Sequence, residues 1–160
     1  MSNAVIPRPR PRVVASRYRF ALVASQFNAE YVQGLVNHAT EELRALAPGA
    51  AISLHQVPGA FEIPIVVREL AVQERVDAIL AIGVILKGST AHAEHLAHSV
   101  TNALQQIAID RGVPVINAVL SVEDDAQARE RCLEKKINRG IEAARAAVQI
   151  AGVMQELRGK

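Results

Sequence analysis

The chain has 160 residues and a formal net charge of +2, and half of its residues are hydrophobic although only 3% are aromatic. This length favours one domain with an aliphatic core. No apolar run approaches the ~20 residues of a membrane span, and the first residues lack the apolar centre of a signal peptide. The single cysteine, Cys132, excludes an internal disulfide. We therefore expect neither membrane insertion nor secretion, but a reducing, cytoplasmic location.

The N-terminal segment is basic and rich in proline. Five arginines and no acidic residue precede Phe20, and proline alternates with arginine over residues 7–12. Alternating proline opposes helix and favours an extended chain. We predict an extended arm over residues 1–17, either disordered or docked on another subunit, followed by a single domain over residues 18–160. Because the rest of the chain is slightly acidic, we expect no nucleic-acid binding by the domain itself.

Hydrophobic periodicity predicts strands that alternate with helices. Apolar or alternating runs of strand length lie at residues 18–25, 52–57, 78–85 and 115–120, and helical spacing follows at about residues 29–46, 64–75, 91–111, 122–136 and 141–157. Asn28 and Ser121 are expected to cap the first and fourth helices. This order predicts an α/β fold, a three-layer αβα sandwich around a four-stranded parallel, flavodoxin-like sheet.

Ligands bind such sheets beyond the carboxyl ends of the strands. The loops predicted at this edge carry Phe27, Glu62 and residues 87–90. Phe27 is either a core aromatic or a flat platform for a ring-shaped ligand. Glu62 either caps a helix or accepts hydrogen bonds from ligand hydroxyls. The topology allows Phe27, Glu62 and His92 to converge although they are far apart in the sequence.

The stretch from Gly83 to His92, GVILKGSTAH, is the strongest candidate site. Gly88 allows a tight turn, and Ser89 and Thr90 bring hydroxyls and free N–H groups to a helix start, where anions bind. His92 follows on the first helical turn, and its imidazole can carry protons near neutral pH. A P-loop needs a lysine between the glycine and the hydroxyl residue, whereas Lys87 precedes Gly88. We therefore expect phosphate binding rather than nucleoside triphosphate hydrolysis.

Three histidines, His92, His95 and His98, recur at every third position of the predicted third helix. At helical pitch this spacing could supply two zinc ligands. No cysteine lies nearby and no His-Glu-x-x-His pair is present, so we favour a structural or solvated role for His95 and His98 and predict no metal site.

Arg131 and Lys135 form an i,i+4 basic pair on the predicted fourth helix. Such pairs are usually solvated or matched by neighbouring glutamates. A phosphate bound at Ser89 and Thr90 would need a cationic partner, and an arginine offers a bidentate one. Both interpretations stay open for Arg131.

Four stretches resemble the lumazine synthases of riboflavin biosynthesis, and the resemblance covers about residues 19–157. They are QFN at 26–28, VPGAFEIP at 57–64, GVILKGSTAH at 83–92 and RCLEKKINRG at 131–140. The second and third, together and in this order, are highly specific to that family. The resemblance implies condensation of 5-amino-6-(D-ribitylamino)uracil with 3,4-dihydroxy-2-butanone 4-phosphate to 6,7-dimethyl-8-ribityllumazine, phosphate and water, without a metal or organic cofactor.

The resemblance also implies residue roles. The residue matching Phe27 stacks on the pyrimidine ring, and the one matching His92 moves protons. The other matching positions contact the ribityl chain (Ala60, Phe61 and Glu62), the uracil through backbone groups (Val84, Ile85 and Leu86) and the phosphate (Ser89, Thr90 and Arg131). Asn117 replaces an aromatic residue that lines the uracil site from a neighbouring subunit, largely through its backbone.

A homo-oligomer is also implied by the resemblance. The family forms pentamers with active sites between adjacent subunits, and some members close pentamers into an icosahedral shell of sixty subunits. The chain has no insertion at residues 136–140, which is similar to the shell-forming members. In such an assembly the arm before Phe20 would add a strand to a neighbour's sheet.

An alternative function is a catalytically weak relative that binds lumazine or flavin ligands, or that serves as a scaffold. The presence of Phe27, Glu62, His92 and Arg131 favours the enzyme. The substitutions at Asn117 and around His95, where Ala93 and His95 replace the aromatic residues usual in the family, keep the alternative open.

Overall fold

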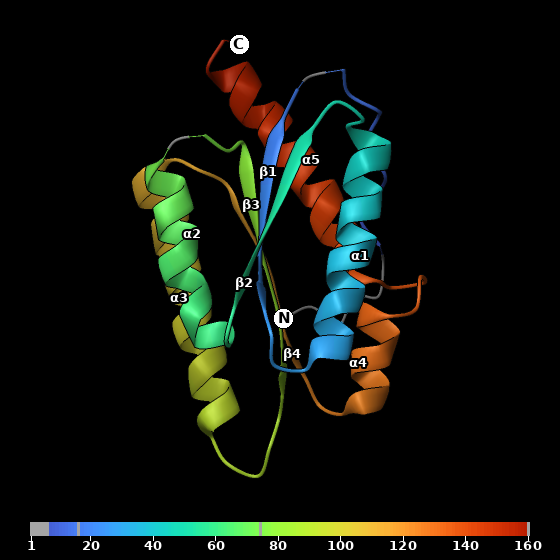
Figure 1. The fold of residues 1–160 in the computed structure, drawn as a ribbon, viewed down its shortest axis with the longest axis vertical. Coiled ribbons are helices and arrows are strands. Elements are labelled where there is room, and N and C mark those ends of the chain that lie inside the picture. The colour runs from blue at the N-terminus through green and yellow to red at the C-terminus, as the bar shows by residue number, and fades with distance from the viewer. Residues whose placement is uncertain (1–6, 16, 74, 160) are drawn as a thin grey trace.

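The computed structural model describes residues 7–15, 17–73 and 75–159. Within these residues four parallel strands form one sheet in the order β2-β1-β3-β4 (Figure 1). The strands are β1 (Arg19–Ser25), β2 (Ala51–Val57), β3 (Ala78–Leu86) and β4 (Val115–Val122). The helices are α1 (Ala29–Leu46), α2 (Ile63–Val72), α3 (His92–Arg111), α4 (Asp125–Cys132) and α5 (Arg139–Leu157), with a 3-10 turn at Ala60–Glu62.

The helices cover both faces of the sheet. Helices α1, α4 and α5 lie on one face, and α2 and α3 lie on the other (Figure 1). Phe20 and Leu22 of β1 pack toward the first layer, and Ala21 and Val23 pack toward the second. Successive side chains of a strand point to opposite faces, which explains why the central strands are apolar throughout. The predicted three-layer α/β fold is confirmed.

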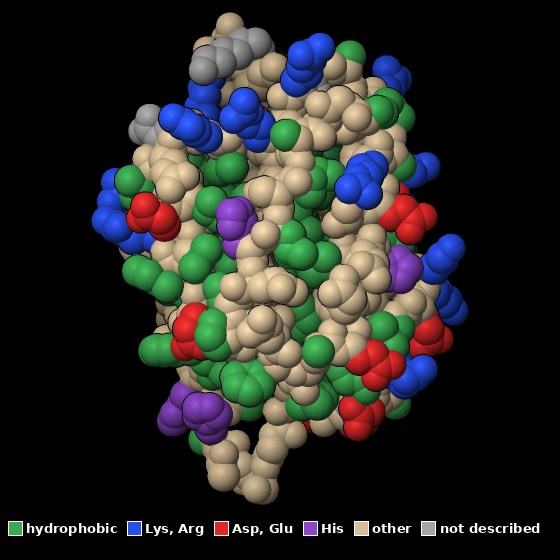
Figure 2. Space-filling view, in the orientation of Figure 1, with side chains coloured by type: hydrophobic (Ala, Val, Ile, Leu, Met, Phe, Trp, Pro, Cys, Tyr) green, Lys and Arg blue, Asp and Glu red, His purple; other side chains and the backbone are tan. Residues whose placement is uncertain are grey.

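In α1 and α3, acidic side chains lie at the start of the helix and basic side chains at its end. The first turns of α1 and α3 carry Glu30 and Glu94, and their last turns carry Arg44 and Arg111. Figure 2 shows lysine and arginine side chains gathered toward the upper end of the molecule. Each helix dipole favours this arrangement, with acids at the N-terminus and bases at the C-terminus. The carboxyl ends of the strands therefore meet the positive ends of the helix dipoles at one edge.

Asn28 is the N-cap residue of α1, as predicted, but its side chain makes no capping bond. Both predicted ends of the fourth helix are wrong. Ser121 does not cap a helix, because β4 continues through it beside β3 to Val122. Asp124 is the cap of α4, and its Oδ1 accepts from Gln127 N at 2.8 Å. The predicted helix to residue 136 ends at Cys132, because Asn138 starts α5 by accepting from two backbone N–H groups.

The described part of the arm, residues 7–15 and 17, forms neither helix nor strand and packs on its own chain. Val14 N donates to Leu46 O at 2.9 Å, and Arg10 Nη2 donates to Glu42 Oε1 at 3.0 Å. The first six residues of the predicted arm lie outside the described residues. Docking on a neighbouring subunit stays a prediction.

The structure also bears on membrane insertion. None of the helices in the described stretches is long and apolar enough to cross a lipid bilayer.

Candidate active site

The loops after β1 and β2 lie against each other at the carboxyl edge of the sheet. Ser25 pairs with Val57, and Gln26 N then donates to Val57 O at 2.9 Å. A Cβ atom built on Gly59 would lie 2.9 Å from two ring carbons of Phe27, so the ring packs directly on bare backbone. Phe27 is nevertheless 69% exposed. The interpretation of Phe27 as a core aromatic is therefore wrong, and its ring forms an open platform.

Glu62 lies beside this platform. Its Oε1 accepts from Gly59 N at 3.0 Å, so the carboxylate closes the first turn of the 3-10 segment. Its second oxygen has no hydrogen bond among the described residues, and the side chain is half-buried. Ala60 is buried next to it and Phe61 is exposed. The cap and the ligand interpretation are thus compatible, because the bond to Gly59 fixes one oxygen and leaves the other available.

The end of β3 offers backbone groups to the same place. The β1 pairing of β3 stops at Ile82, whereas its β4 pairing continues to Leu86. Backbone groups of successive strand residues point to opposite edges. Lys87 N donates to Val122 O on the β4 side, which places Val84 and Leu86 on the β1 side. Leu86 therefore has no strand partner there within the described chain.

Asn28 is a residue of this site that the sequence reasoning missed. It adopts a left-handed conformation with φ 59°, and its Nδ2 donates to Val84 O at 2.7 Å. Asparagine tolerates this backbone region better than most residues. The signal was its position directly after Phe27, but only the fold shows that its amide joins the ends of β1 and β3.

The loop from Gly88 to Ala91 protrudes between β3 and α3 and is exposed throughout. A Cβ on Gly88 would meet nothing within 4 Å in the described chain, and Gly88 has no positive φ, so the expected tight turn is not what requires glycine here. Thr90 Oγ1 accepts from His92 N at a long 3.4 Å. The His92 side chain is exposed and has no hydrogen bond to any described residue. Figure 2 shows histidines beside this loop.

Arg131 lies in a second group of residues, around a cavity of about 410 Å³ beside β4 and α4. Its Nη1 is buried and has no hydrogen-bond partner in the described part of the chain. Two other cations line the cavity, but each already has an acid: Lys87 pairs with Glu123 at 2.5 Å, and Arg139 pairs with Glu142. The sequence placed Lys87 at this edge of the sheet but did not single out Gln127 and Arg139, which also line the cavity. A buried guanidinium with an unused donor is suited to binding an anion.

The group formed by Phe27 and Glu62 and the group around Arg131 do not share one cavity within a single chain. Thr90 lines a separate hollow of about 490 Å³, which meets the Arg131 cavity only through Lys87 and Ser121. Phe27 and Glu62 line neither hollow. The structure thus brings Phe27, Glu62 and Val84 together, and it leaves Arg131 apart from Thr90.

The comparison with known proteins decides the family. Residues 17–155 match the family model described as 6,7-dimethyl-8-ribityllumazine synthase. The chain belongs to this family. A protein of that name from Azoarcus sp. (strain BH72) is 37% identical over 140 residues, which cover 87% of each chain. Another, from Syntrophus aciditrophicus (strain SB), is 33% identical over 147 residues, which cover 91% of this chain and 96% of the relative.

Membership in the lumazine synthase family makes the chain a transferase of riboflavin biosynthesis. The resemblance inferred from the four sequence stretches is therefore confirmed.

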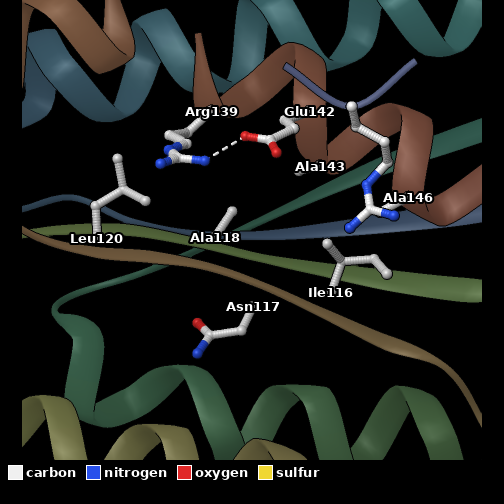
Figure 3. A pocket seen from close by; sticks show the side chains of 9 residues that line it. Ile116, Asn117, Ala118, Leu120, Arg139, Glu142, Ala143 and Ala146 are labelled. Carbon is white, nitrogen blue, oxygen red and sulfur yellow. Dashed lines mark hydrogen bonds and ion pairs between the residues drawn. The ribbon is translucent and has the colours of Figure 1, made fainter. Parts of the chain in front are cut away.

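Asn117 of β4 lines two of the cavities, those of about 180 and 410 Å³. Its Nδ2 donates to Thr101 Oγ1 of α3 at 3.4 Å, and its Oδ1 accepts from Val119 N at 3.1 Å. A cavity of about 180 Å³ lies on the other side of β4, below the Arg139–Glu142 pair of α5, and Figure 3 shows Asn117 pointing away from that pair. The amide is thus tied to its own strand and to α3, and Asn117 lines both this cavity and the one beside Arg131.

No metal centre is formed by the described side chains. In residues 7–15, 17–73 and 75–159, no three histidine, cysteine, aspartate or glutamate side chains lie close enough together to hold an ion. His92, His95 and His98 therefore do not make a metal site within that part of the chain.

Proposed function

We propose that the chain condenses 5-amino-6-(D-ribitylamino)uracil with 3,4-dihydroxy-2-butanone 4-phosphate to 6,7-dimethyl-8-ribityllumazine, phosphate and water. The observation that carries this proposal is the exposed Phe27 ring on Gly59, bordered by Glu62 and followed by Asn28, whose amide joins this loop to Val84 at the end of β3. A flat ring with a hydroxylated chain needs a stacking surface, directed backbone donors and acceptors, and a carboxylate for its hydroxyls. These three features meet at one place.

In this proposal Phe27 stacks on the pyrimidine, and the polar edge of this ring binds along Val84, Ile85 and Leu86 to the backbone groups that face β1. Val84 O already accepts from Asn28. The free groups at this end of β3 are therefore those beyond it, at Leu86. The Glu62 oxygen that Gly59 does not occupy accepts from ribityl hydroxyls, with Ala60 and Phe61 beside the chain.

The phosphate of the second substrate binds between Arg131 and the loop that carries Ser89 and Thr90. The unused buried donor of Arg131 and the free N–H groups at the start of α3 support this assignment. Since the two groups lie apart in one chain, they meet across the contact between adjacent subunits. A homo-pentamer, with or without closure into an icosahedral shell, is part of the proposal, as is a cytoplasmic location.

His92 moves protons in the reaction. The substrate amine attacks the ketone, and a first water leaves as the imine forms. Phosphate is then eliminated, which leaves a new carbonyl, and the second amine attacks this carbonyl and closes the ring with loss of a second water. Each of these steps transfers a proton, and a positioned histidine typically contributes about 10²–10⁴-fold. Holding both substrates together supplies further acceleration by proximity. The exposed imidazole at the first turn of α3 has no competing bond to a described residue.

The test is to mix the purified protein with both substrates and follow the fluorescence of the lumazine product against a protein-free control. We expect a rate that saturates with each substrate and lies well above the uncatalysed rate. A rate equal to the control, together with intact binding of a ribityl ligand, would instead identify a catalytically weak binding or scaffold protein.

A further inference from the structure

The helix that carries Arg131 has few apolar contacts of its own. In α4, which is described in full, only Ala128 and Cys132 are buried. The remaining side chains of this helix are polar or exposed. Apolar burial, which fixes most helices of a globular domain, therefore contributes little to the orientation of α4.

A single short hydrogen bond ties the N-terminal end of α4 to α1. The hydroxyl of Tyr31 donates to Asp125 Oδ1 at 2.6 Å. Tyr31 is 8% exposed and Asp125 is exposed, so this bond lies at the border of the buried contact. The carboxylate of Asp125 raises the pKa of Tyr31 to about 12, and the phenol therefore remains a donor at neutral pH. Hydrogen bonds to a charged acceptor are among the stronger ones in proteins.

The C-terminal end of α4 is held by backbone contact instead. A Cβ on Gly34 of α1 would lie 2.5 Å from Cys132 O, so the two helices touch there without a side chain between them. His38 Nε2 donates to Leu133 O at 3.1 Å. A further contact with α1, between Arg129 in the last turn of α4 and Glu30, spans 3.5 Å with both side chains more than half exposed. Such exposed pairs contribute little.

Arg131 depends on this orientation. Arg131 lines the cavity that Gln127 of the same helix also lines, and its buried Nη1 has no hydrogen-bond partner in the described part of the chain. An arginine binds phosphate through two parallel N–H groups, and this geometry is lost when the helix that carries it rotates.

We propose that Tyr31 and Asp125 are positioning residues that hold α4 on α1, so that Arg131 presents its guanidinium to the phosphate of the ketone substrate. This inference rests on the proposed function. Neither side chain touches the substrate; both act through Arg131. With the contact at Cys132 acting as a pivot, loss of the tie at the other end lets α4 swing and turns the guanidinium away.

The decisive variant is Tyr31→Phe, which removes one hydroxyl and keeps the buried ring. Loss of one hydrogen bond of this kind weakens binding by a moderate factor. We therefore expect the KM for the phosphorylated ketone and the inhibition constant of inorganic phosphate to rise about 3- to 10-fold. The KM for the ribitylaminouracil stays at the wild-type value. Asp125→Ala gives the same result, and the double variant is no worse than either single variant.

Two matched variants separate positioning from general damage. Asp125→Asn keeps an oxygen acceptor for Tyr31, and we expect it to restore most of the affinity for phosphate. Glu30→Gln breaks only the exposed pair between α1 and Arg129 of α4, and we expect wild-type constants.

Inorganic phosphate binding is also measured by calorimetric titration, which needs no turnover. If the wild-type protein does not condense its substrates, the proposed function fails, while weaker phosphate binding by Tyr31→Phe still supports the positioning role. If the wild-type protein condenses and Tyr31→Phe leaves both phosphate constants unchanged, the positioning role is wrong. It is also wrong if both KM values rise equally, because that result shows a general structural effect.

Discussion

At the scale of single residues, the side chains of the candidate site differ in the hydrogen bonds that they make to the rest of the chain. Asn28 joins the ends of β1 and β3 through one bond to Val84 O, whereas His92 has no side-chain bond to any residue that the structure describes. A residue with no structural contacts is free to act on a substrate and costs little stability when it is removed. We therefore expect that replacing His92 leaves the free energy of unfolding nearly unchanged, whereas replacing Asn28 removes a bond between the ends of β1 and β3.

His92→Ala tests the proton-transfer role. We expect turnover to fall by about 10²–10⁴-fold, because a general acid-base group is lost. The affinity for a ribityl ligand and the free energy of unfolding stay near the wild-type values, since the side chain is exposed. Stopped-flow fluorescence and ligand titration measure the two quantities. His95→Ala, one turn further along the exposed side of α3, is the control, and wild-type turnover in His92→Ala would remove the residue from the mechanism.

Tyr31 and Cys132 make the free energy of unfolding depend on pH in the alkaline range. Burial raises the pKa of Cys132 from 9.0 to about 12, and the bond to Asp125 raises that of Tyr31 from 10.0 to about 12. A folded state with a raised pKa is favoured fully below the unfolded pKa and loses that advantage as pH rises through the folded value.

We therefore expect the free energy of unfolding attributable to these groups to be constant below pH 9 and to fall as pH rises from 9 toward 12. Urea titrations at a series of pH values measure it. Cys132→Ala, which has no thiol to ionise, should lose stability less steeply in this range. An equally steep loss in the variant would show that folding does not raise the pKa of Cys132.

At the scale of elements, Glu42 of α1 connects three segments that are distant in sequence. Its carboxylate accepts from Arg145 Nε of α5 at 2.6 Å and from Arg10 Nη2 of the arm at 3.0 Å. Arg145 Nη1 also donates to Arg8 O at 2.7 Å. Glu42 is 8% exposed, so its charge needs these partners. The same residues hold the arm on its own chain.

Glu42→Ala should release the arm and leave Arg145 without its acid. Breaking a partly buried pair from one side costs about 2–4 kcal/mol, which denaturant unfolding measures. The amide of Val14, bonded to Leu46 O at 2.9 Å, should exchange its hydrogen faster in the variant. Glu41→Ala changes the neighbouring exposed residue of α1 and should leave both quantities unchanged. Unaltered exchange at Val14 in Glu42→Ala would show that other contacts hold the arm.

At the scale of the whole molecule, the proposed site is incomplete in one chain. Phe27 and Glu62 lie at the ends of β1 and β2, and Arg131 lies on α4 beside β4, at the other side of the sheet. A cyclic assembly in which each subunit contacts the next through different surfaces would bring the Arg131 of one copy to the Phe27 of another.

Mixed assemblies test this arrangement. We expect Phe27→Ala and Arg131→Ala to be nearly inactive when each is produced alone. When the two are co-produced in equal amounts, random assembly puts an intact Phe27 and an intact Arg131 at about a quarter of the interfaces, and activity should recover to that level. The product assay on the co-purified mixture measures it. Activity no higher than the sum of the two separate variants would show that each site lies within one chain.

The strands were predicted to within one or two residues, because burial on both faces of a central parallel strand leaves a continuous apolar run. The helix ends were predicted less well where several residues could serve as a cap. Ser121 and Asp124 are both suitable, and the pairing of Ser121 with Ile85 decides between them. Local sequence does not determine which of the two caps α4, because this depends on how far β3 extends beside β4.

The sequence by itself determined the α/β class, the parallel order and the residue types at the carboxyl edge, because these follow from local periodicity and from motifs of adjacent residues. Only the tertiary structure decided that Phe27 is an exposed platform, that Asn28 bonds to Val84 and that Arg131 keeps an unused donor. Each of these depends on contacts between segments far apart in the chain. Such contacts are set by packing, which no local pattern of residues encodes.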